Sequence, residues 1–251
     1  KEVKDISVFV KFIVHSSEFI GNTFVLAWTT TPWTLPGNVL LAVGPDVTYV
    51  VVKTKDSGPS EIFGQYIIAK DIFEKWQQET RAKWEAFQIN KESGSTDFSL
   101  LKMFFCHNSD ILKEVKGSGL VGLTYEPLFP YYKETQKAFR VVAADFVSTN
   151  DGTGVVHIAP AFGEDDYNVG KREKIPLVQH VNMDGTMKPE VTDFAGMDVK
   201  PKDEPSKMDI EVIKWLAHNG KLFAKEKITH SYPHCWRCDT PLLNYATSSW
   251  F

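Results

Sequence analysis

Three consecutive threonines, Thr29, Thr30 and Thr31, stand at the end of a predicted strand and are followed at once by Pro32. Because proline cannot donate to a strand ladder, we expect it to end the strand and leave hydroxyl and backbone groups at an exposed edge. Two tryptophans and two prolines surround the run and favour a rigid pocket over a plain strand edge. Threonine is also common in strands for packing reasons alone, so the run by itself specifies no reaction.

A second segment of interest covers residues 152–167 and reads GTGVVHIAPAFGEDDY. Period-two alternation places His157 on one face of its strand with the residues two positions away, where a lone histidine is more often an ordinary core or edge residue. The acidic run at 164–166 is typical of a helix start, where each carboxylate offsets the helix dipole by about 0.3–1 kcal/mol. This segment alone does not specify a reaction either.

Motifs of several common enzyme classes are absent from the sequence, including the GxSxG nucleophile elbow, the HExxH zinc motif and the Walker loop. The glycines at 152 and 154 precede an apolar run, whereas a dinucleotide-binding fingerprint follows a strand and opens a helix. With Asn150 and Asp151 before them, they are interpreted as a hairpin turn.

Cys235 and Cys238 have the CxxC spacing of metal ligands, with His230 and His234 nearby. A structural zinc site needs four ligands, usually two pairs, and Cys106 stands alone. Two interpretations remain equally supported. The cysteines are free thiols, or they are half of a zinc site that is completed by sequence beyond this chain.

Composition limits the function classes. The 251 residues are 43% hydrophobic and carry a formal net charge of −4, which favours a real core and argues against broad, sequence-independent nucleic-acid binding. A localised contact with nucleic acid stays compatible with this charge. Three cysteines favour a reducing compartment, here the cytoplasm, and no apolar run predicts a membrane span. The chain starts at Lys1 and stops at Phe251 in mid-pattern, which indicates a piece of something longer.

The elements that must position these residues are mostly strands. Helical spacing with suitable caps predicts helices over 71–87 and 206–219, with Ser206 as the N-cap of the second. Short turns between strands favour antiparallel hairpins. The expected fold class is α+β, with a mainly antiparallel, β-barrel-like core and peripheral helices. The predicted strands are 4–14, 24–30, 38–43, 48–53, 63–69, 100–106, 140–144 and 155–159.

Taken together, WTTTPWTLPGN, GTGVVHIAPAFGEDDY, HSYPHCWRCDTPL and SSWF resemble the editing domain of isoleucyl-tRNA synthetases, the insertion called connective peptide one. The resemblance spans essentially the whole chain. The related valyl and leucyl editing domains carry TTRPET where this chain has TTPWT, and they lack the GTGxVHxAP run. The resemblance implies that residues 1–251 are a single editing domain of the valyl, isoleucyl and leucyl type, excised from a larger synthetase.

The activity implied by the resemblance is hydrolysis of valine wrongly esterified to the isoleucine tRNA. Valine lacks one methylene of isoleucine, which is worth only about 0.8 kcal/mol on burial, and a second, smaller pocket excludes isoleucine by size. This double-sieve logic is the established explanation for this enzyme class, and the resemblance extends it to this chain. The implied partner is the valine-bearing 3′ end of the tRNA, bound by a monomer.

The adenylate-forming motifs HIGH and KMSKS are absent, so this chain is not expected to aminoacylate. ATP would serve only the missing catalytic domain, and editing needs no cofactor. In related sequences the CxxC motif contributes to a zinc site with another pair upstream. The resemblance therefore implies zinc for the full enzyme, with Cys235 and Cys238 as half of the site, and no metal in the fragment.

The resemblance also implies roles for residues. Thr29, Thr30 and Thr31 line the pocket and contact the aminoacyl ester and the terminal adenosine. His157 lies against the amino-acid side chain and excludes isoleucine. Asp166, nine positions later, binds the α-ammonium of the substrate.

Further substrate-binding candidates are Trp33, Asn38, Phe162 and Asp165, the last replacing Asp166 if the local register differs. Water is expected to attack the ester directly, without an acyl-enzyme, and His157 is interpreted as a pocket wall rather than a general base. The alternative function is a module that binds the tRNA 3′ end and has no activity when isolated.

Overall fold

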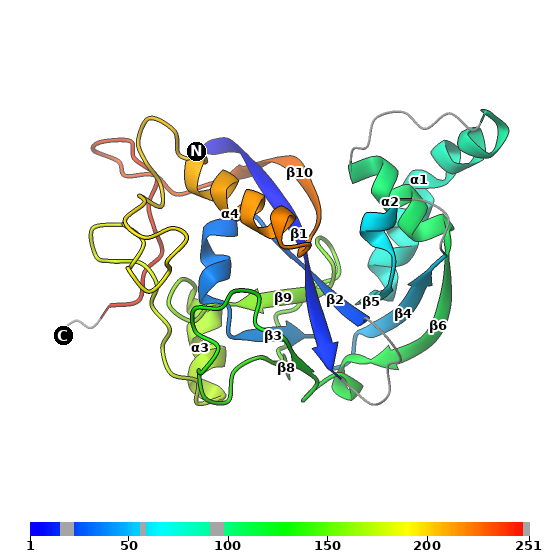
Figure 1. Ribbon diagram of the computed structural model, residues 1–251, viewed down its shortest axis with the longest axis horizontal. Coiled ribbons are helices and arrows are strands. Elements are labelled where there is room, and N and C mark those ends of the chain that lie inside the picture. Colours follow the sequence, from blue (N-terminus) through cyan, green and yellow to red (C-terminus); the bar gives the residue numbers. More distant parts are fainter. Residues whose placement is uncertain (16–22, 56–58, 91–97, 248–251) are drawn as a thin grey trace.

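Strand β1 (Glu2–His15) is the centre of the fold because its apolar residues are buried on both faces over most of its length. It pairs with three strands, β2, β7 and β10, all antiparallel. The computed structural model describes residues 1–15, 23–55, 59–90 and 98–247, and Figure 1 shows β1 running through the middle of the molecule. The motif SSWF, residues 248–251, lies outside the described residues.

The strands form one mixed sheet in the order β6-β4-β5-β2-β1-β7-β8-β3-β9, with β10 added on β1. Two pairs are parallel, β2 with β5 and β3 with β8, and the other pairs are antiparallel. The remaining strands are β2 (Thr23–Thr29), β3 (Leu40–Val43), β4 (Thr48–Thr54), β5 (Gln65–Ala69), β6 (Ser109–Lys116), β7 (Thr124–Tyr125), β8 (Arg140–Ala143), β9 (Val155–Ile158) and β10 (Leu222–Ser231).

The α+β class is confirmed, but the barrel-like core is not. Strand β9 lies beside β2, yet the described residues form no ladder between them, so the sheet stays open. The reason is that β2 already has β1 on one edge and β5 on the other. The glycine turn before β9 is present, but β9 pairs with β3 rather than forming a hairpin with β8.

Helices cover the sheet from two sides (Figure 1). Helix α4 lies over β1 and β10, and its predicted span of 206–219 is nearly matched. Ser206 sits at the N-cap position, but its hydroxyl donates to Asp5 and accepts no hydrogen bond from an N–H of the described helix. The helices are α1 (Lys70–Asn90), α2 (Phe98–His107), α3 (Glu164–Arg172) and α4 (Lys207–His218), with short 3₁₀ helices η1 (Pro32–Gly37), η2 (Ser60–Ile62) and η3 (Gly117–Gly119).

The predicted strand over 100–106 is wrong, because these residues belong to helix α2. Its buried positions Leu100, Met103 and Phe104 have the i, i+3, i+4 spacing of a helix face. A short apolar run contains too few residues for periodicity to separate a buried strand from a buried helix.

Among the described residues, no helix is both long and apolar enough to cross a membrane.

The core beneath α1 and α2 is built from aromatic rings. Phe105 is fully buried and makes edge-to-face contacts with Tyr66, Phe73 and Phe223 at centroid distances of 5.3, 5.8 and 5.3 Å. These partners come from β5, α1 and β10. A single ring of α2 therefore contacts α1 and two strands of the sheet, β5 and β10.

Replacing that ring tests the packing. Phe105→Ala should lower the free energy of unfolding by about 3–5 kcal/mol, because it removes a buried ring and leaves a cavity. Phe146→Ala, at a side chain that is 41% exposed, is the matched control and should change it by about 0.5 kcal/mol or less. Urea unfolding followed by circular dichroism measures both. Equal losses in the two variants would contradict the proposed packing role.

Candidate active site

The threonine run folds back on itself where β2 ends. The Thr29 hydroxyl accepts a hydrogen bond from the Thr31 N–H at 3.1 Å and lies 3.2 Å from the Thr31 hydroxyl. Pro32 then starts η1, where its fixed φ suits the first helical position. The Thr34 N–H and hydroxyl both donate to the Thr31 carbonyl, at 3.0 and 2.8 Å. The run is therefore a tight polar turn and not an extended strand edge.

His157 joins this turn from β9. Its Nε2 lies 3.1 Å from the Thr34 hydroxyl, which is itself 3.4 Å from the Thr31 hydroxyl. Because the single Thr34 hydroxyl proton is donated to a carbonyl, which can only accept, Nε2–H must be the donor to Thr34. The Nδ1 atom is then an acceptor, and it is buried without a partner in the described part of the chain. Burial lowers the pKa of His157 to about 4, so the ring is neutral at pH 7.

Asp166 lies in the first turn of α3, as the acidic run predicted. Its Oδ2 accepts a hydrogen bond from the backbone N–H of Ala159, just past β9, at 2.8 Å. Burial raises the pKa of Asp166 from 3.8 to about 6, and the Ala159 hydrogen bond offsets part of that rise. The group is thus a carboxylate at pH 7 that is largely withdrawn from water, close to the strand that carries His157.

The other predicted residues divide into two kinds. Trp33 and Phe162 are buried, and their rings meet edge to face with centroids 5.2 Å apart, so they pack beside the turn in the core. Asn38 is also buried. Its amide donates to the Leu40 carbonyl at 3.0 Å and accepts from the Tyr125 hydroxyl at 2.8 Å, so its side chain holds neighbouring segments together. Asp165 is exposed beside Asp166.

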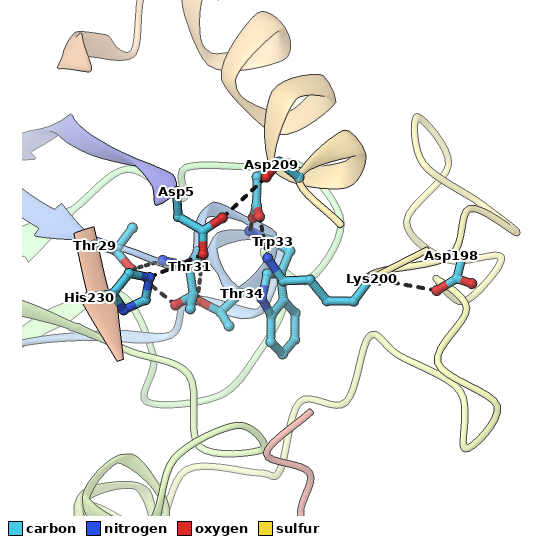
Figure 2. Close-up of polar contacts among 10 residues, drawn as sticks. Asp5, Thr29, Thr31, Trp33, Thr34, Asp198, Lys200, Asp209 and His230 are labelled. Atoms are coloured by element: carbon cyan, nitrogen blue, oxygen red, sulfur yellow. Dashed lines mark hydrogen bonds and ion pairs between the residues drawn. The ribbon is translucent and has the colours of Figure 1, made fainter. Parts of the chain in front are cut away.

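The backbone of Trp33 is held from two distant parts of the chain. Its N–H donates to Asp209 Oδ1 on α4 at 3.0 Å, and its carbonyl accepts from His180 Nε2 at 3.0 Å. Asp209 is paired with Lys200 at 2.7 Å, and both side chains are at most 4% exposed. Figure 2 shows this pair beside the threonine turn.

Sequence reasoning missed these positioning residues, although signals were present. Asp209 lies within the apolar stripe of its helix, next to Met208 and three residues before Val212. A carboxylate at a core-facing position needs a buried partner, which is a signal in itself. Gly37 also helps to position His180, and no signal in the sequence indicated this. A Cβ at position 37 would lie 2.5 Å from the Nδ1 of His180, so a larger residue there would collide with the ring.

Two cavities lie near residues of the predicted site, and the first is lined in part by the turn. One, of about 400 Å³, is lined by Thr30, Trp28 and Gly152, with His230 on its wall. The Nε2 of His230 is 3.1 Å from Asp5 Oδ2. A second, of about 420 Å³, lies beside the start of α3 and is lined by Gly163 and other residues. Within the described part of the chain, the Thr30 hydroxyl makes no hydrogen bond, so it is free to contact a molecule in the first cavity.

Cys235 and Cys238 lie side by side in the C-terminal loop. The hydroxyl of Thr240 is 3.1 Å from the Cys238 sulfur, and hydrogen bonding to it lowers the pKa of Cys238 to about 7. Two thiols of this kind suit half of a tetrahedral zinc site. The described residues contain no cluster of three or more His, Cys, Asp or Glu side chains able to hold a metal.

Comparison with known proteins identifies the relatives of this chain. No family model matches it. Over its whole length it is 41% identical to the isoleucine–tRNA ligase of Clostridium tetani, 40% to that of Bdellovibrio bacteriovorus and 39% to that of Thermoplasma volcanium. The chain belongs to the isoleucine–tRNA ligase family. It spans about a fifth of the length of these relatives.

Solved structures place the fold of this isoleucine–tRNA ligase segment. It matches GlLeuRS-CP1 with a TM-score of 0.55 at 15% identity, over 90% of this chain and 100% of that one. It also matches the cytosolic leucyl-tRNA synthetase editing domain of P. knowlesi, with a TM-score of 0.53 at 15% identity, over 87% of this chain and 95% of that one. The resemblance found in the motifs is confirmed, and the segment has the fold of synthetase editing domains.

The environment of Asp166 predicts a pH-dependent stability. Its folded pKa of about 6 lies above the ordinary value of 3.8, so its contribution to stability is fully present below pH 4 and is lost as the pH rises through 6. Asp166→Asn keeps an acceptor for Ala159 and removes the buried charge. We expect the free energy of unfolding to rise by about 1–2 kcal/mol at pH 7.5 and to change little at pH 4.

Urea unfolding at the two pH values measures this difference. Asp165→Asn, at the exposed neighbour, is the control and should show no such pH dependence. A stability change of Asp166→Asn that is the same at pH 7.5 and pH 4 would show that the Asp166 carboxylate is not destabilised by burial.

Proposed function

We propose that this isoleucine–tRNA ligase segment hydrolyses the ester of valine attached by mistake to the isoleucine tRNA. The observation that carries the proposal is the position of Asp166, a partly buried carboxylate that accepts the N–H of Ala159, just past the strand that bears His157. Family membership and the editing-domain fold support it. Aminoacylation and its ATP requirement belong, on this proposal, to the rest of the ligase.

Asp166 is the proposed anchor for the α-ammonium group of the substrate. A carboxylate that is partly desolvated gains more from a cation than one in open water, because the local dielectric is lower. An ammonium partner would also lower the pKa of Asp166 and keep it ionised. Asp165 fits this role less well, because it is exposed on the outer side of the same helical turn.

His157 is the proposed wall that excludes isoleucine. The pairing of His157 with Leu41 fixes its backbone in the sheet, and the bond to Thr34 holds its ring, so the ring cannot move aside without breaking that bond. A neutral ring with a pKa near 4 is a weak proton acceptor at pH 7, which favours the wall over a general base. Rigid exclusion would supply the selectivity that about 0.8 kcal/mol per methylene cannot.

Direct attack by water is the proposed chemistry. Thr34 is the hydroxyl nearest to His157, but its proton is committed to the Thr31 carbonyl and His157 donates to it, so the pair does not form an activated nucleophile. The hydroxyls of Thr29 and Thr31 are engaged with each other. Such preorganised donors and acceptors suit the orientation of a water molecule and the stabilisation of an oxyanion.

The cavity of about 400 Å³ beside Thr30 is the proposed place of the terminal adenosine. Trp28 offers an aromatic surface there, and a nucleobase can stack on such a surface. The net charge of −4 fits a domain that contacts only the 3′ end of the tRNA, with the rest of the ligase holding the remainder. Cys235 and Cys238 would contribute to zinc binding only with ligands from elsewhere in the ligase, and the domain would act as a monomer.

Deacylation of matched substrates tests the proposal. The chain should hydrolyse Val-tRNA bearing the isoleucine anticodon well above background and leave the Ile-tRNA intact. Asp166→Asn should reduce the valine rate about 10- to 150-fold, the equivalent of losing a charged hydrogen bond of about 1.5–3 kcal/mol. Release of radiolabelled amino acid measures the rates.

Two controls accompany this assay. Asp165→Asn should keep the valine rate, and a loss there in place of Asp166 would move the ammonium anchor by one residue. Equal, background-level hydrolysis of both substrates by the unmodified chain would overturn the hydrolase proposal. If a non-hydrolysable valyl-adenosine ester analogue still bound, the alternative of a binding module would stand.

Enlarging the pocket tests the wall. His157→Ala should let the isoleucine ester enter, so that the valine and isoleucine rates converge to within about fourfold, the ratio equivalent to one methylene at about 0.8 kcal/mol. His218→Ala, an exposed histidine at the end of α4, is the matched control and should keep full discrimination. Continued rejection of isoleucine by the His157 variant would place the sieve at another residue.

A further inference from the structure

The first turn of η1 contains one donor that its own segment cannot satisfy. Pro32 has no N–H, and the Thr34 N–H bonds the Thr31 carbonyl. Thr31 stands at the N-cap position but makes no capping bond with its side chain. The N–H of Trp33 is thus the orphan donor of this turn, and a buried donor of this kind needs a partner from elsewhere.

We propose that the buried Asp209–Lys200 pair is a positioning unit that sets the threonine turn against His157 for hydrolysis. Asp209 accepts the Trp33 N–H at 3.0 Å, and Lys200 holds the other carboxylate oxygen at 2.7 Å. The pair acts as a helix cap supplied from 176 residues away. The inference rests on the proposed function and names residues that the motifs did not assign.

Stability alone gives a weak reason for this pair. Removing two charges from water is costly, and a pair of apolar residues in the same volume is often as stable or more so. Helix α4 already presents Met208, Val212 and Leu216 to the core, so an apolar residue at 209 would continue its buried stripe. What an apolar residue cannot do is accept the Trp33 N–H.

Lys200 keeps this acceptor strong. Burial raises the pKa of Asp209, and the Lys200 ammonium works in the opposite direction and favours the carboxylate. Lys200 is itself held in place, with its backbone N–H on Asp198 Oδ1 at 3.1 Å and its ammonium 5.4 Å from the centre of the Tyr232 ring. Figure 2 shows Lys200 reaching from the Asp198 loop towards the turn.

The position of Trp33 gives the pair control over the reacting region. Trp33 lies between Thr31 and Thr34, whose hydroxyls are 3.4 Å apart, and Thr34 in turn lies 3.1 Å from His157. A shift of the Trp33 peptide therefore moves both hydroxyls relative to the histidine. Misplacement by about 1 Å in an active site can cost about 100-fold in rate.

Two paired substitutions separate positioning from packing. Asp209→Leu with Lys200→Met replaces the ion pair by apolar side chains and removes the acceptor. We expect a modestly lower melting temperature because the Trp33 N–H loses its acceptor, a kcat for Val-tRNA deacylation at least 10-fold lower, and a KM changed much less. Asp209→Asn with Lys200→Met keeps an amide oxygen for Trp33 and should restore most of kcat.

Hydrogen exchange at the Trp33 amide gives a readout that does not depend on activity. Exchange should be slow in the unmodified chain and in the Asn/Met variant, and fast in the Leu/Met variant. A Leu/Met variant with unchanged kcat would overturn the proposal, and so would fast exchange in the unmodified chain. If the Leu/Met variant does not fold, the Asn/Met variant decides, because loss of its kcat at an unchanged melting temperature overturns the proposal.

Failure of the proposed function is seen separately. An unmodified chain that does not deacylate Val-tRNA refutes the hydrolase activity. The Trp33 exchange pattern across the same variants still tests whether the pair holds the turn.

Discussion

The backbone of one residue, Trp33, links the parts of this structure that matter for chemistry. Its N–H is satisfied from α4 and its carbonyl from His180, so the threonine turn is fixed by residues that follow it by more than 140 positions. The Thr34–His157 bond connects the same turn to β9, which lies beside β2 without pairing with it. Because no strand ladder among the described residues joins β2 to β9, side chains make the connection between them, and the threonine turn lies at this junction.

Burial has opposite effects on the two titratable groups nearest to this junction. It raises the pKa of Asp166 and lowers that of His157, because in each case water is withdrawn from the charged form. The acid still ionises near neutral pH, whereas the imidazole stays uncharged. The same physical effect thus prepares a carboxylate for a cation and a neutral ring for an apolar side chain, as the editing proposal requires.

Local patterns predicted the parts of the fold that depend on local physics. Alternation and β-branched residues placed β1 and β2 correctly, whereas His157 and Asp166 were selected by the resemblance of their motif to isoleucyl-tRNA synthetases. The helix α2 was missed because a short apolar run suits either structure. Asp209 and His180 were missed because their partner is a backbone group far away in the chain, and a single sequence contains no record of that contact.

The ladder between β1 and β10 has a consequence for how the molecule comes into being. It pairs Glu2 with Ser231 and continues to Val10 with Leu222, so it closes a loop of more than 200 residues. Long-range pairings of this kind form late and slow the folding reaction. During synthesis, the β10-facing edge of the central strand stays unpaired until residues 222–231, more than 200 positions further on, have left the ribosome.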